Sequence, residues 1–164
     1  MKALYPISGN PPTWGHAELV SRATKVFTEV EWALAVNPAK SYLFPLKDRL
    51  EMLNDYIRHY ALVNVTVSAY EGSTARYAMK IGAKAILRGL RNATDLQAEM
   101  EQAMGNQGIA SQVQTVAMFT SPAHSMISSS LVRELALLGE DITPYVHPQV
   151  AERIRGLLDT VPAH

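Results

Sequence analysis

The stretch that decides the fold is residues 3–23, ALYPISGNPPTWGHAELVSRA, where an apolar run meets a polar loop and then a helical pattern. Ala3–Tyr5 is typical of a strand, and the segment from Pro6 to Pro12 is rich in turn-forming residues. Thr13-Trp14-Gly15-His16 then opens a helix with a histidine in its first turn. Because the first N–H groups of a helix have no internal partner and the helix dipole adds positive potential, this geometry favours a bound phosphate. A motif this short also fits an ordinary turn with a surface histidine.

The composition indicates a globular protein and excludes several classes of function. A chain of 164 residues fits a single domain over 1–164, and 48% hydrophobic with 18% charged residues argues against disorder. Basic and acidic residues balance at 15 each, so no overall field attracts nucleic acid or a membrane, and any anion site must be local. The absence of cysteine excludes disulfides and thiolate metal sites. No stretch approaches the length of a membrane span, and we expect a cytoplasmic protein.

Strand-like and helix-like segments alternate along the chain, which predicts an α/β fold with a parallel sheet and helices on its faces. The expected helices begin near Gly15, Pro45, Thr74, Asp95 and Pro148. The expected strands after the first one are 30–36, 63–67, 85–87 and 114–119. Apolar spacing predicts two buried helix stripes, one of Leu50, Leu53, Ile57 and Tyr60, the other of Leu96, Met100 and Met104.

Cationic side chains follow two of these strands. Lys40 comes just after 30–36, and Arg88-Gly89-Leu90-Arg91 comes directly after 85–87. Ligands of open α/β sheets gather at the carboxyl ends of strands. Arginine offers a planar donor fork that matches phosphate oxygens, and glycine allows a close approach of the backbone. A second interpretation pairs both arginines with nearby carboxylates such as Asp95 and Glu99.

A serine-rich segment follows the last strand. Ser128-Ser129-Ser130 opens a helix, and Arg133 comes one turn later. An N-cap requires only one hydroxyl, so the surplus of donors indicates an anion. Three anion-binding elements therefore follow three strands, at one edge of the sheet. Because the chain has neither a P-loop nor a GxGxxG motif, another nucleotide-handling fold is indicated.

These motifs resemble those of a known family. Thr13–His16 resembles the T/HxGH signature of the nucleotidyltransferase superfamily, and residues 127–133, ISSSLVR, resemble its ISSxxxR-type signature. Together with RGLR at 88–91, the chain resembles bacterial phosphopantetheine adenylyltransferases over nearly its whole length. The resemblance implies a Rossmann-like nucleotidyltransferase fold, with a five-stranded parallel sheet and helices on both faces, and a homohexamer.

The reaction implied by the resemblance belongs to coenzyme A biosynthesis. The adenylyl group of ATP passes to 4′-phosphopantetheine, giving dephospho-coenzyme A and pyrophosphate. The acceptor's own phosphate attacks the α-phosphorus, so the protein supplies positioning and charge stabilisation rather than a nucleophile, with Mg²⁺ assisting.

The resemblance also implies roles for individual residues. His16, Lys40 and Arg88 are the expected catalytic residues, with His16 donating to the α-phosphate. The acceptor is expected to contact Ser8, Lys40, Thr74 and Arg88. The residues expected to bind ATP are Ser8, Gly9, His16, Gly89, Leu90, Arg91, Glu99, His124, Ser125, Met126, Ile127, Ser128, Ser129 and Ser130.

Two segments depart from the family pattern. The family usually reads Y-P-G-[ST]-F-D-P, whereas this chain has Ile7, Gly9 and Asn10 at the glycine, aromatic and aspartate positions. A β-branched Ile7 cannot cheaply adopt the conformations open to glycine, so a different loop path is expected. In the expected acceptor pocket, Ser73, Thr74 and Arg76 replace apolar, acidic or amide residues. This change is either neutral variation in a loop or a sign of a different, more anionic phosphorylated acceptor.

Two alternative functions stay open at this stage. The first is an adenylyltransferase with another acceptor, such as nicotinate mononucleotide, since Asn10-Pro11-Pro12-Thr13 faintly resembles the loop of that family. The second is a non-catalytic nucleotide-binding homologue. The presence of His16, Lys40 and Arg88 together argues against the second.

Overall fold

The computed structural model describes residues 1–160, and the last four residues of the expected 1–164 domain lie outside this range. Its centre is a five-stranded, fully parallel sheet in the order β3-β2-β1-β4-β5. The strands are β1 (Lys2–Ile7), β2 (Glu29–Val36), β3 (Val65–Glu71), β4 (Ala85–Leu90) and β5 (Gln114–Phe119). The strand order reverses between β1 and β4, and such a switch point is where ligands bind in open α/β sheets.

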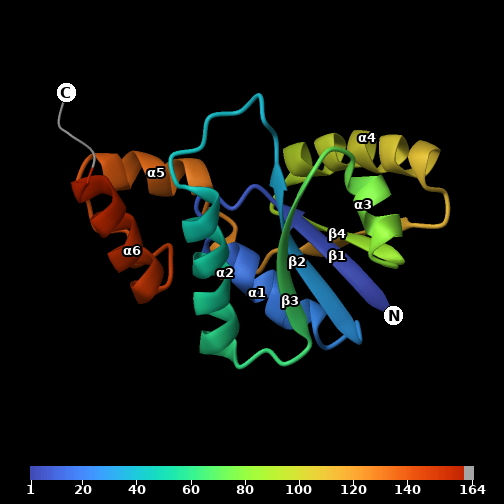
Figure 1. Ribbon diagram of the computed structural model, residues 1–164, viewed down its shortest axis with the longest axis horizontal. Helices are drawn as coiled ribbons and strands as arrows, with labels where there is room; N and C mark the ends of the chain where they lie inside the picture. The colour runs from blue at the N-terminus through green and yellow to red at the C-terminus, as the bar shows by residue number, and fades with distance from the viewer. Residues whose placement is uncertain (161–164) are drawn as a thin grey trace.

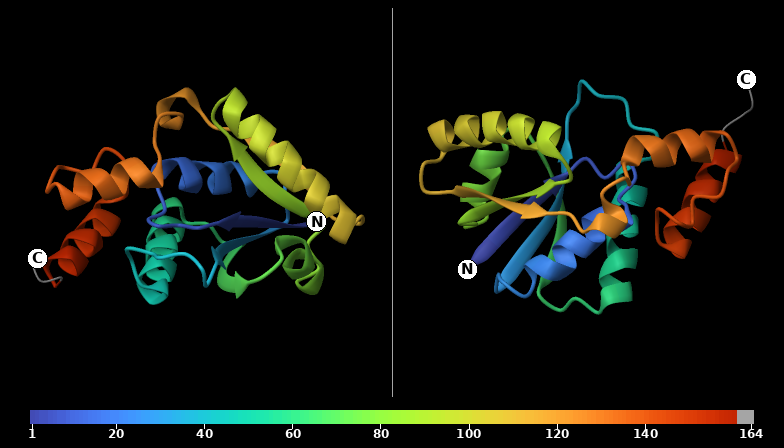
Figure 2. Two further views of the ribbon diagram at one scale, coloured as in Figure 1. Left: turned by 90° about the horizontal axis from the view of Figure 1, so that it is seen from above. Right: turned by 180° about the vertical axis from the view of Figure 1, so that it is seen from behind.

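Helices cover both faces of this sheet. Figure 1 shows α1 (Trp14–Ala23) and α2 (Leu46–Tyr60) on one side of the strands, with α3 (Thr74–Lys80) and α4 (Ala93–Ile109) on the other. A short 3₁₀ turn, Pro122–His124, precedes α5 (Ser129–Leu137), and α6 (Pro148–Asp159) follows. Both views of Figure 2 show α5 and α6 projecting beyond one end of the sheet. The predicted Rossmann-like architecture is therefore confirmed.

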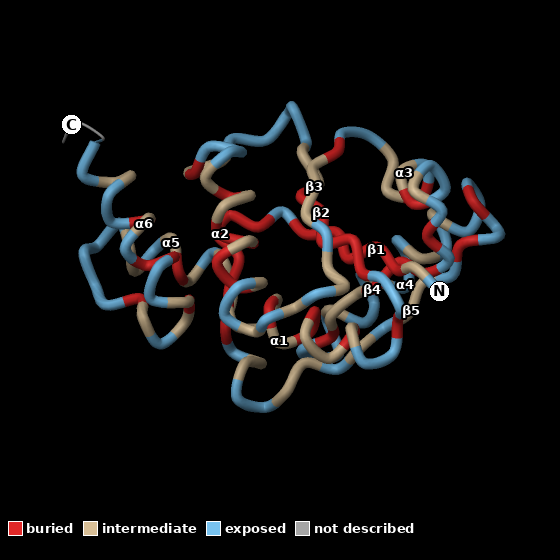
Figure 3. Tube along the Cα trace, turned by 60° about the horizontal axis from the view of Figure 1, so that its bottom comes forward, coloured by how far each residue is buried: buried red, intermediate tan, exposed pale blue. Residues whose placement is uncertain are grey.

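The alternation of side chains along β1 divides the core between the two faces. Ala3, Tyr5 and Ile7 belong to the larger cluster beneath α1 and α2, whereas Leu4 belongs to the smaller cluster beneath α3. Figure 3 shows the buried positions concentrated on the central strands. Hydrophobic burial in both directions explains why these strands read as nearly continuous apolar runs.

The rotation of α4 differs from the prediction. Leu96, Met100 and Met104 were expected to face the core, but their exposed fractions are 45%, 57% and 71%. The half-buried positions of this helix include Asp95 and Glu99 instead. Asp95 pairs with Arg91 and Glu99 with Arg88, both on or next to β4. The ion pairs therefore set which face of α4 turns inward, and the apolar stripe faces outward.

The buried face of α2 is also shifted from the prediction. Leu53 is buried as expected, whereas Leu50, Ile57 and Tyr60 are only partly buried against the core. Two charged side chains, Arg49 and Asp55, are each only 2% exposed on the same helix. Apolar periodicity cannot reveal buried charges.

Element ends differ by a few residues. α1 ends at Ala23 rather than near Phe27, and β3 covers Val65–Glu71 rather than 63–67, leaving Val63 98% exposed. β4 continues to Leu90, so most of the RGLR run is strand rather than loop. Within residues 1–160, no helix is long and apolar enough to cross a membrane.

Candidate active site

A cavity of about 420 Å³ opens at the carboxyl edge of the sheet, over β1 and β4. The loop after β1, the first turn of α1, the end of β4, the start of α4 and the start of α5 form its walls. The lining residues are Tyr5, Pro6, Ile7, Ser8, Thr13, Gly15, His16, Leu19, Arg88, Gly89, Arg91, Asp95, Glu99, Thr120, His124, Ile127, Ser128, Ser129, Ser130 and Arg133. The structure thus brings together the three anion-binding elements that the sequence predicted.

Most of the predicted site residues line this cavity, and some do not. Those that line it are Ser8, His16, Arg88, Gly89, Arg91, Glu99, His124, Ile127, Ser128, Ser129 and Ser130. Those outside its lining are Gly9, Lys40, Thr74, Leu90, Ser125 and Met126. Met126 is 86% exposed, and Lys40 lies in an exposed turn after β2.

His16 is held in one tautomer by the residue that begins its helix. The backbone N–H of Thr13 donates to His16 Nδ1 at 3.1 Å, and Thr13 Oγ1 lies 2.9 Å from the same atom. Nδ1 therefore carries a lone pair, and the proton of the neutral ring is on Nε2. Burial and then the charge of Arg91 lower the pKa of His16 to about 4. Near neutral pH, His16, which lines the cavity, thus has an uncharged ring whose donor is Nε2–H.

The two arginines of the RGLR run are paired with carboxylates. Arg88 contacts Glu99 through two nitrogens, with Nη2 donating to Oε1 at 2.7 Å. Arg91 makes a similar fork with Asp95, where Nε and Nη2 donate at 2.9 and 3.1 Å. These bonds raise the pKa of Arg91 and lower that of Asp95. The alternative interpretation, in which the arginines pair with Asp95 and Glu99, is correct for this structure.

The serine-rich segment stabilises the loop after β1 as well as lining the cavity. Ser128 caps α5 by accepting from the N–H of Leu131. Ser129 Oγ donates to the carbonyl of Pro11 at 2.7 Å, and Arg133 Nη1 donates to the carbonyl of Asn10 at 2.6 Å. Ser129 and Arg133, two of the donors expected to bind an anion, therefore hydrogen-bond to the backbone of this protein.

The departures in the loop after β1 fit one another sterically. Gly9 has a φ of +54°, and a Cβ there would lie 2.5 Å from Leu34 Cδ2 and 3.3 Å from Ile7 Cδ1. Ile7 and Leu34 occupy the space that a side chain at position 9 would need, so a larger residue there would have to displace them and adopt a φ that favours glycine. Asn10 is buried, and its Oδ1 accepts from the N–H of Phe44 at 3.2 Å.

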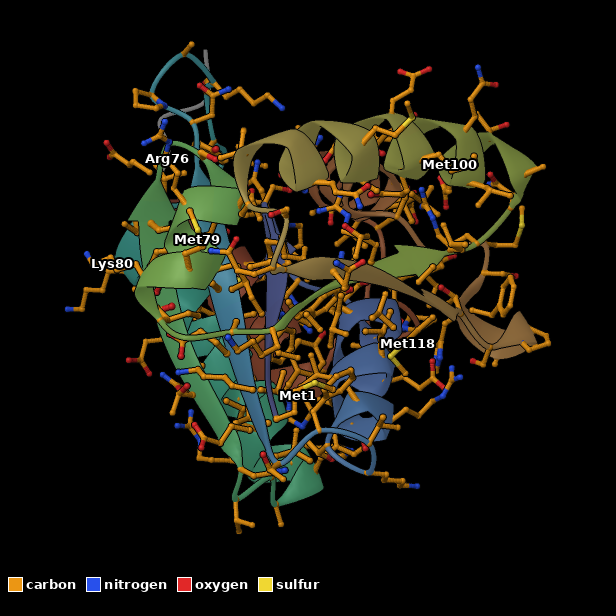
Figure 4. The ribbon with its side chains drawn as sticks, turned by 90° about the vertical axis from the view of Figure 1, so that its right-hand side faces the viewer. Met1, Arg76, Met79, Lys80, Met100 and Met118 are labelled. Carbon is orange, nitrogen blue, oxygen red and sulfur yellow. The ribbon has the colours of Figure 1, made fainter. Side chains whose placement is uncertain are left out.

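Of the residues expected to bind the acceptor, Ser8 and Arg88 line the main cavity, whereas Lys40 and Thr74 follow β2 and β3 and lie outside its lining. Thr74 begins α3 and its hydroxyl bonds that of Tyr70 at 2.8 Å. A second cavity, of about 440 Å³, is lined by Ala69, Tyr70, Glu71, Gly72, Ser73, Arg76, Tyr77 and Lys80. Figure 4 shows Arg76 and Lys80 on α3, with Lys80 pointing outward. Ser73 and Arg76 thus line a pocket that shares no lining residue with the main cavity.

Arg49 and Tyr42 are residues that sequence reasoning missed. Arg49 Nη1 donates to the carbonyl of Ser8 at 2.8 Å, and its guanidinium lies 4.0 Å from the centre of the Tyr42 ring. Neither residue lines the main cavity. The one available signal was a charged residue directly beside the predicted stripe of α2, and this pattern is common on solvated helix faces.

The comparisons with known proteins identify the family of the chain. A family model described as cytidylyltransferase-like matches residues 8–135. Phosphopantetheine adenylyltransferase of Gloeobacter violaceus is 38% identical over 155 residues, covering 94% of this chain and 95% of that relative. The enzyme of the same name from a Synechococcus species is 41% identical over 159 residues, covering 97% and 95%.

Two solved structures show the same fold at low sequence identity. A putative nicotinate-nucleotide adenylyltransferase from Vibrio parahaemolyticus has a TM-score of 0.69 at 20% identity, covering 93% of this chain and 97% of that one. A nicotinic acid mononucleotide adenylyltransferase from Plasmodium falciparum has a TM-score of 0.69 at 15% identity, with 93% of each chain covered. At these identities they support the fold alone, while the full-length relatives support the narrower assignment. The chain belongs to the cytidylyltransferase-like nucleotidyltransferases and, within them, to the phosphopantetheine adenylyltransferase family.

Proposed function

We propose that this protein transfers the adenylyl group of ATP to 4′-phosphopantetheine, forming dephospho-coenzyme A and pyrophosphate. The relatives named for this reaction match the chain over nearly its whole length. Within the site, the observation that carries the proposal is the neutral His16, which carries its proton on Nε2 and lines a cavity together with Arg88 and Arg91.

The chemistry requires alignment and charge stabilisation. An oxygen of the acceptor phosphate bonds to the α-phosphorus of ATP, and the bond from that phosphorus to the bridging oxygen of pyrophosphate breaks. Negative charge grows on the α-phosphate oxygens, where a fixed N–H donor is most effective. In this proposal His16 Nε2–H supplies that donor, and its low pKa keeps it uncharged when substrate is absent.

The remaining roles follow the walls of the cavity. The start of α5, with Ser128, Ser129 and Ser130, would receive the β- and γ-phosphates of ATP. Arg88 and Lys40 would hold the acceptor phosphate, with Ser8 between the reacting groups and Thr74 farther along the acceptor. The other residues proposed to contact the nucleotide are Gly9, Gly89, Leu90, Arg91, Glu99, His124, Ser125, Met126 and Ile127.

Mg²⁺ would arrive with ATP. No cluster of three or more His, Asp or Glu side chains that could hold a metal occurs within residues 1–160. Mg²⁺ commonly keeps several waters and binds through substrate phosphates, so it does not need such a cluster. The carboxylates that line the main cavity, Asp95 and Glu99, are both bonded to arginines. When bound, the ion would neutralise charge on the phosphate oxygens.

We also propose that the protein works as a homohexamer in the cytoplasm, as the family resemblance implies. The outward stripe of α4, formed by Leu96, Met100 and Met104, offers apolar surface to another copy. Light scattering coupled to size-exclusion chromatography checks this assembly: a mass of six chains supports it, and a mass of one chain contradicts it.

Pyrophosphate release tests the reaction. With ATP and phosphopantetheine we expect sustained release, and with ATP and nicotinate mononucleotide we expect none above the rate without acceptor. Faster release with nicotinate mononucleotide would assign the other acceptor. ATP binding without release, whatever the acceptor, would indicate a non-catalytic nucleotide-binding homologue.

A further inference from the structure

Arg49 is a buried cation without a carboxylate partner. Arg49 is only 2% exposed, and its Nε has no hydrogen-bond partner within residues 1–160. The other charged residues that are nearly as buried, Glu31 and Asp55, are paired with Lys2 and with Arg58 and Arg153. Buried charges are normally paired because desolvation is costly. An unpaired one beside a phosphate-binding cavity therefore indicates a role other than stability.

The contacts of Arg49 connect two loops. Through Nη1 it holds the carbonyl of Ser8, in the loop after β1. Its guanidinium also stacks on the ring of Tyr42 at 4.0 Å. The Tyr42 hydroxyl accepts from the N–H of Asn37 at 2.8 Å and donates to the carbonyl of Ala35 at 3.4 Å. Tyr42 thus ties the exposed turn that carries Lys40 back to the end of β2.

The positions of these loops matter for the transfer. Ser8 lines the main cavity, whereas Lys40 stands in an exposed turn outside it. The reach of Lys40 into the cavity depends on how that turn is held. Arg49 and Tyr42 connect the turn to the Ser8 carbonyl, and a second link between the same two segments is the N–H of Phe44, which donates to Asn10 Oδ1. The guanidinium also places a permanent positive charge within hydrogen-bond distance of the Ser8 carbonyl.

We propose that Arg49 is a positioning residue for adenylyl transfer, which acts through Tyr42 to fix the Lys40 turn relative to Ser8 and orients the acceptor phosphate. This inference rests on the function proposed above. It predicts that Arg49 affects the acceptor more than ATP, since ATP is expected to contact chiefly the first turn of α1, β4 and α5.

Steady-state kinetics of Arg49→Met tests the inference. We expect kcat to fall about 10- to 100-fold and the KM for phosphopantetheine to rise more than the KM for ATP, because misplacement of one reactant weakens alignment. Arg49→Lys keeps the charge but loses the planar fork, and should recover only part of this loss. The matched control is Arg153→Met, which removes a half-buried arginine that pairs with Asp55, also has an unpartnered Nε and lies outside both cavities. If both variants lose thermal stability and neither changes kcat or KM by more than about twofold, Arg49 is merely structural and the inference is wrong.

A double-mutant cycle with Lys40→Met identifies the route. If Arg49 acts through the Lys40 turn, Arg49→Met in the Lys40→Met background lowers kcat much less than it does in the wild type. Full additivity of the two losses contradicts the proposed route.

Hydrogen exchange gives a readout that does not depend on turnover. Arg49→Met and the milder Tyr42→Phe should both speed exchange at the amide of Asn37, which donates to the Tyr42 hydroxyl, while Arg153→Met should not. Unchanged exchange at Asn37 in Arg49→Met would overturn the inference. A wild type that turns over no acceptor would instead overturn the proposed function, and the exchange result would still decide whether Arg49 holds the turn.

Discussion

The two walls of the main cavity differ in how their charges are balanced. The loop wall, residues 8–16 with Ser128–Arg133, contains Arg133 bonded to a backbone carbonyl and is backed by Arg49, bonded to another. Neither of these arginines forms an ion pair within the described residues. We call the other side of the cavity, formed by Arg88, Arg91 and the start of α4, the arginine wall. There Arg88 and Arg91 each form an ion pair with a carboxylate of α4. One wall thus offers uncompensated positive charge, and the other holds its cations fixed but neutralised.

This difference suggests a division of labour. The donors of the loop wall already have fixed positions without a substrate. His16, Ser129 and Arg133 are each held by a hydrogen bond to the backbone of this loop. In the arginine wall, the carboxylates of Asp95 and Glu99 reduce the positive charge that Arg88 and Arg91 offer to a ligand.

His16→Ala removes the fixed donor of the loop wall. We expect turnover to fall about 10²- to 10³-fold, the usual effect of removing one donor to a developing oxyanion, with the Kd for ATP within about threefold of the wild type. Turnover with phosphopantetheine and calorimetric ATP binding measure the two quantities. Near-normal turnover in a folded variant would remove His16 from the mechanism.

Glu99→Gln tests whether the carboxylates of the arginine wall reduce the charge of its arginines. Without the carboxylate charge, Arg88 is free to bind an anion, so inorganic pyrophosphate should bind about three to ten times more tightly, the range expected of an ion pair worth roughly 1 kcal/mol. Isothermal titration calorimetry gives the affinity. Glu101→Gln changes the net charge equally from an exposed position of the same helix and should leave binding within about twofold. Weaker binding in Glu99→Gln would mean that Glu99 orients Arg88 rather than restraining it.

The smallest predicted effect is the contribution of His16 to the pH dependence of the free energy of unfolding. The pKa of His16 is lowered from 6.5 to about 4 in the folded protein, so between these values the unfolded chain binds a proton that the folded protein does not. Stability should therefore fall as the pH decreases from 6.5 towards 4. In thermal unfolding, the drop in Tm from pH 7 to pH 5 should be larger for the wild type than for His16→Gln. Equal drops would show that His16 keeps an ordinary pKa.

Sequence reasoning found most of the cavity because its motifs are local. The run from Pro6 to His16, the RGLR run and the serine-rich segment each combine a strand end with turn and capping residues. Parallel strands then place them on one edge. Arg49 and the rotation of α4 were missed for a shared reason. Both depend on which partner a charged side chain meets across the fold, and no periodicity along one helix contains that information.

The sequence by itself determined the parallel α/β fold, the family and the position of His16, because short-range patterns of apolar, turn and capping residues predict each of them. Only the tertiary structure decided how the charges are compensated. Asp95 and Glu99 turned inward to meet two arginines, and the apolar stripe of α4 was left outside. Arg49 was buried against Ser8 and Tyr42 without a carboxylate. Charge pairing acts between segments far apart in the chain, so it is fixed only when the chain has folded.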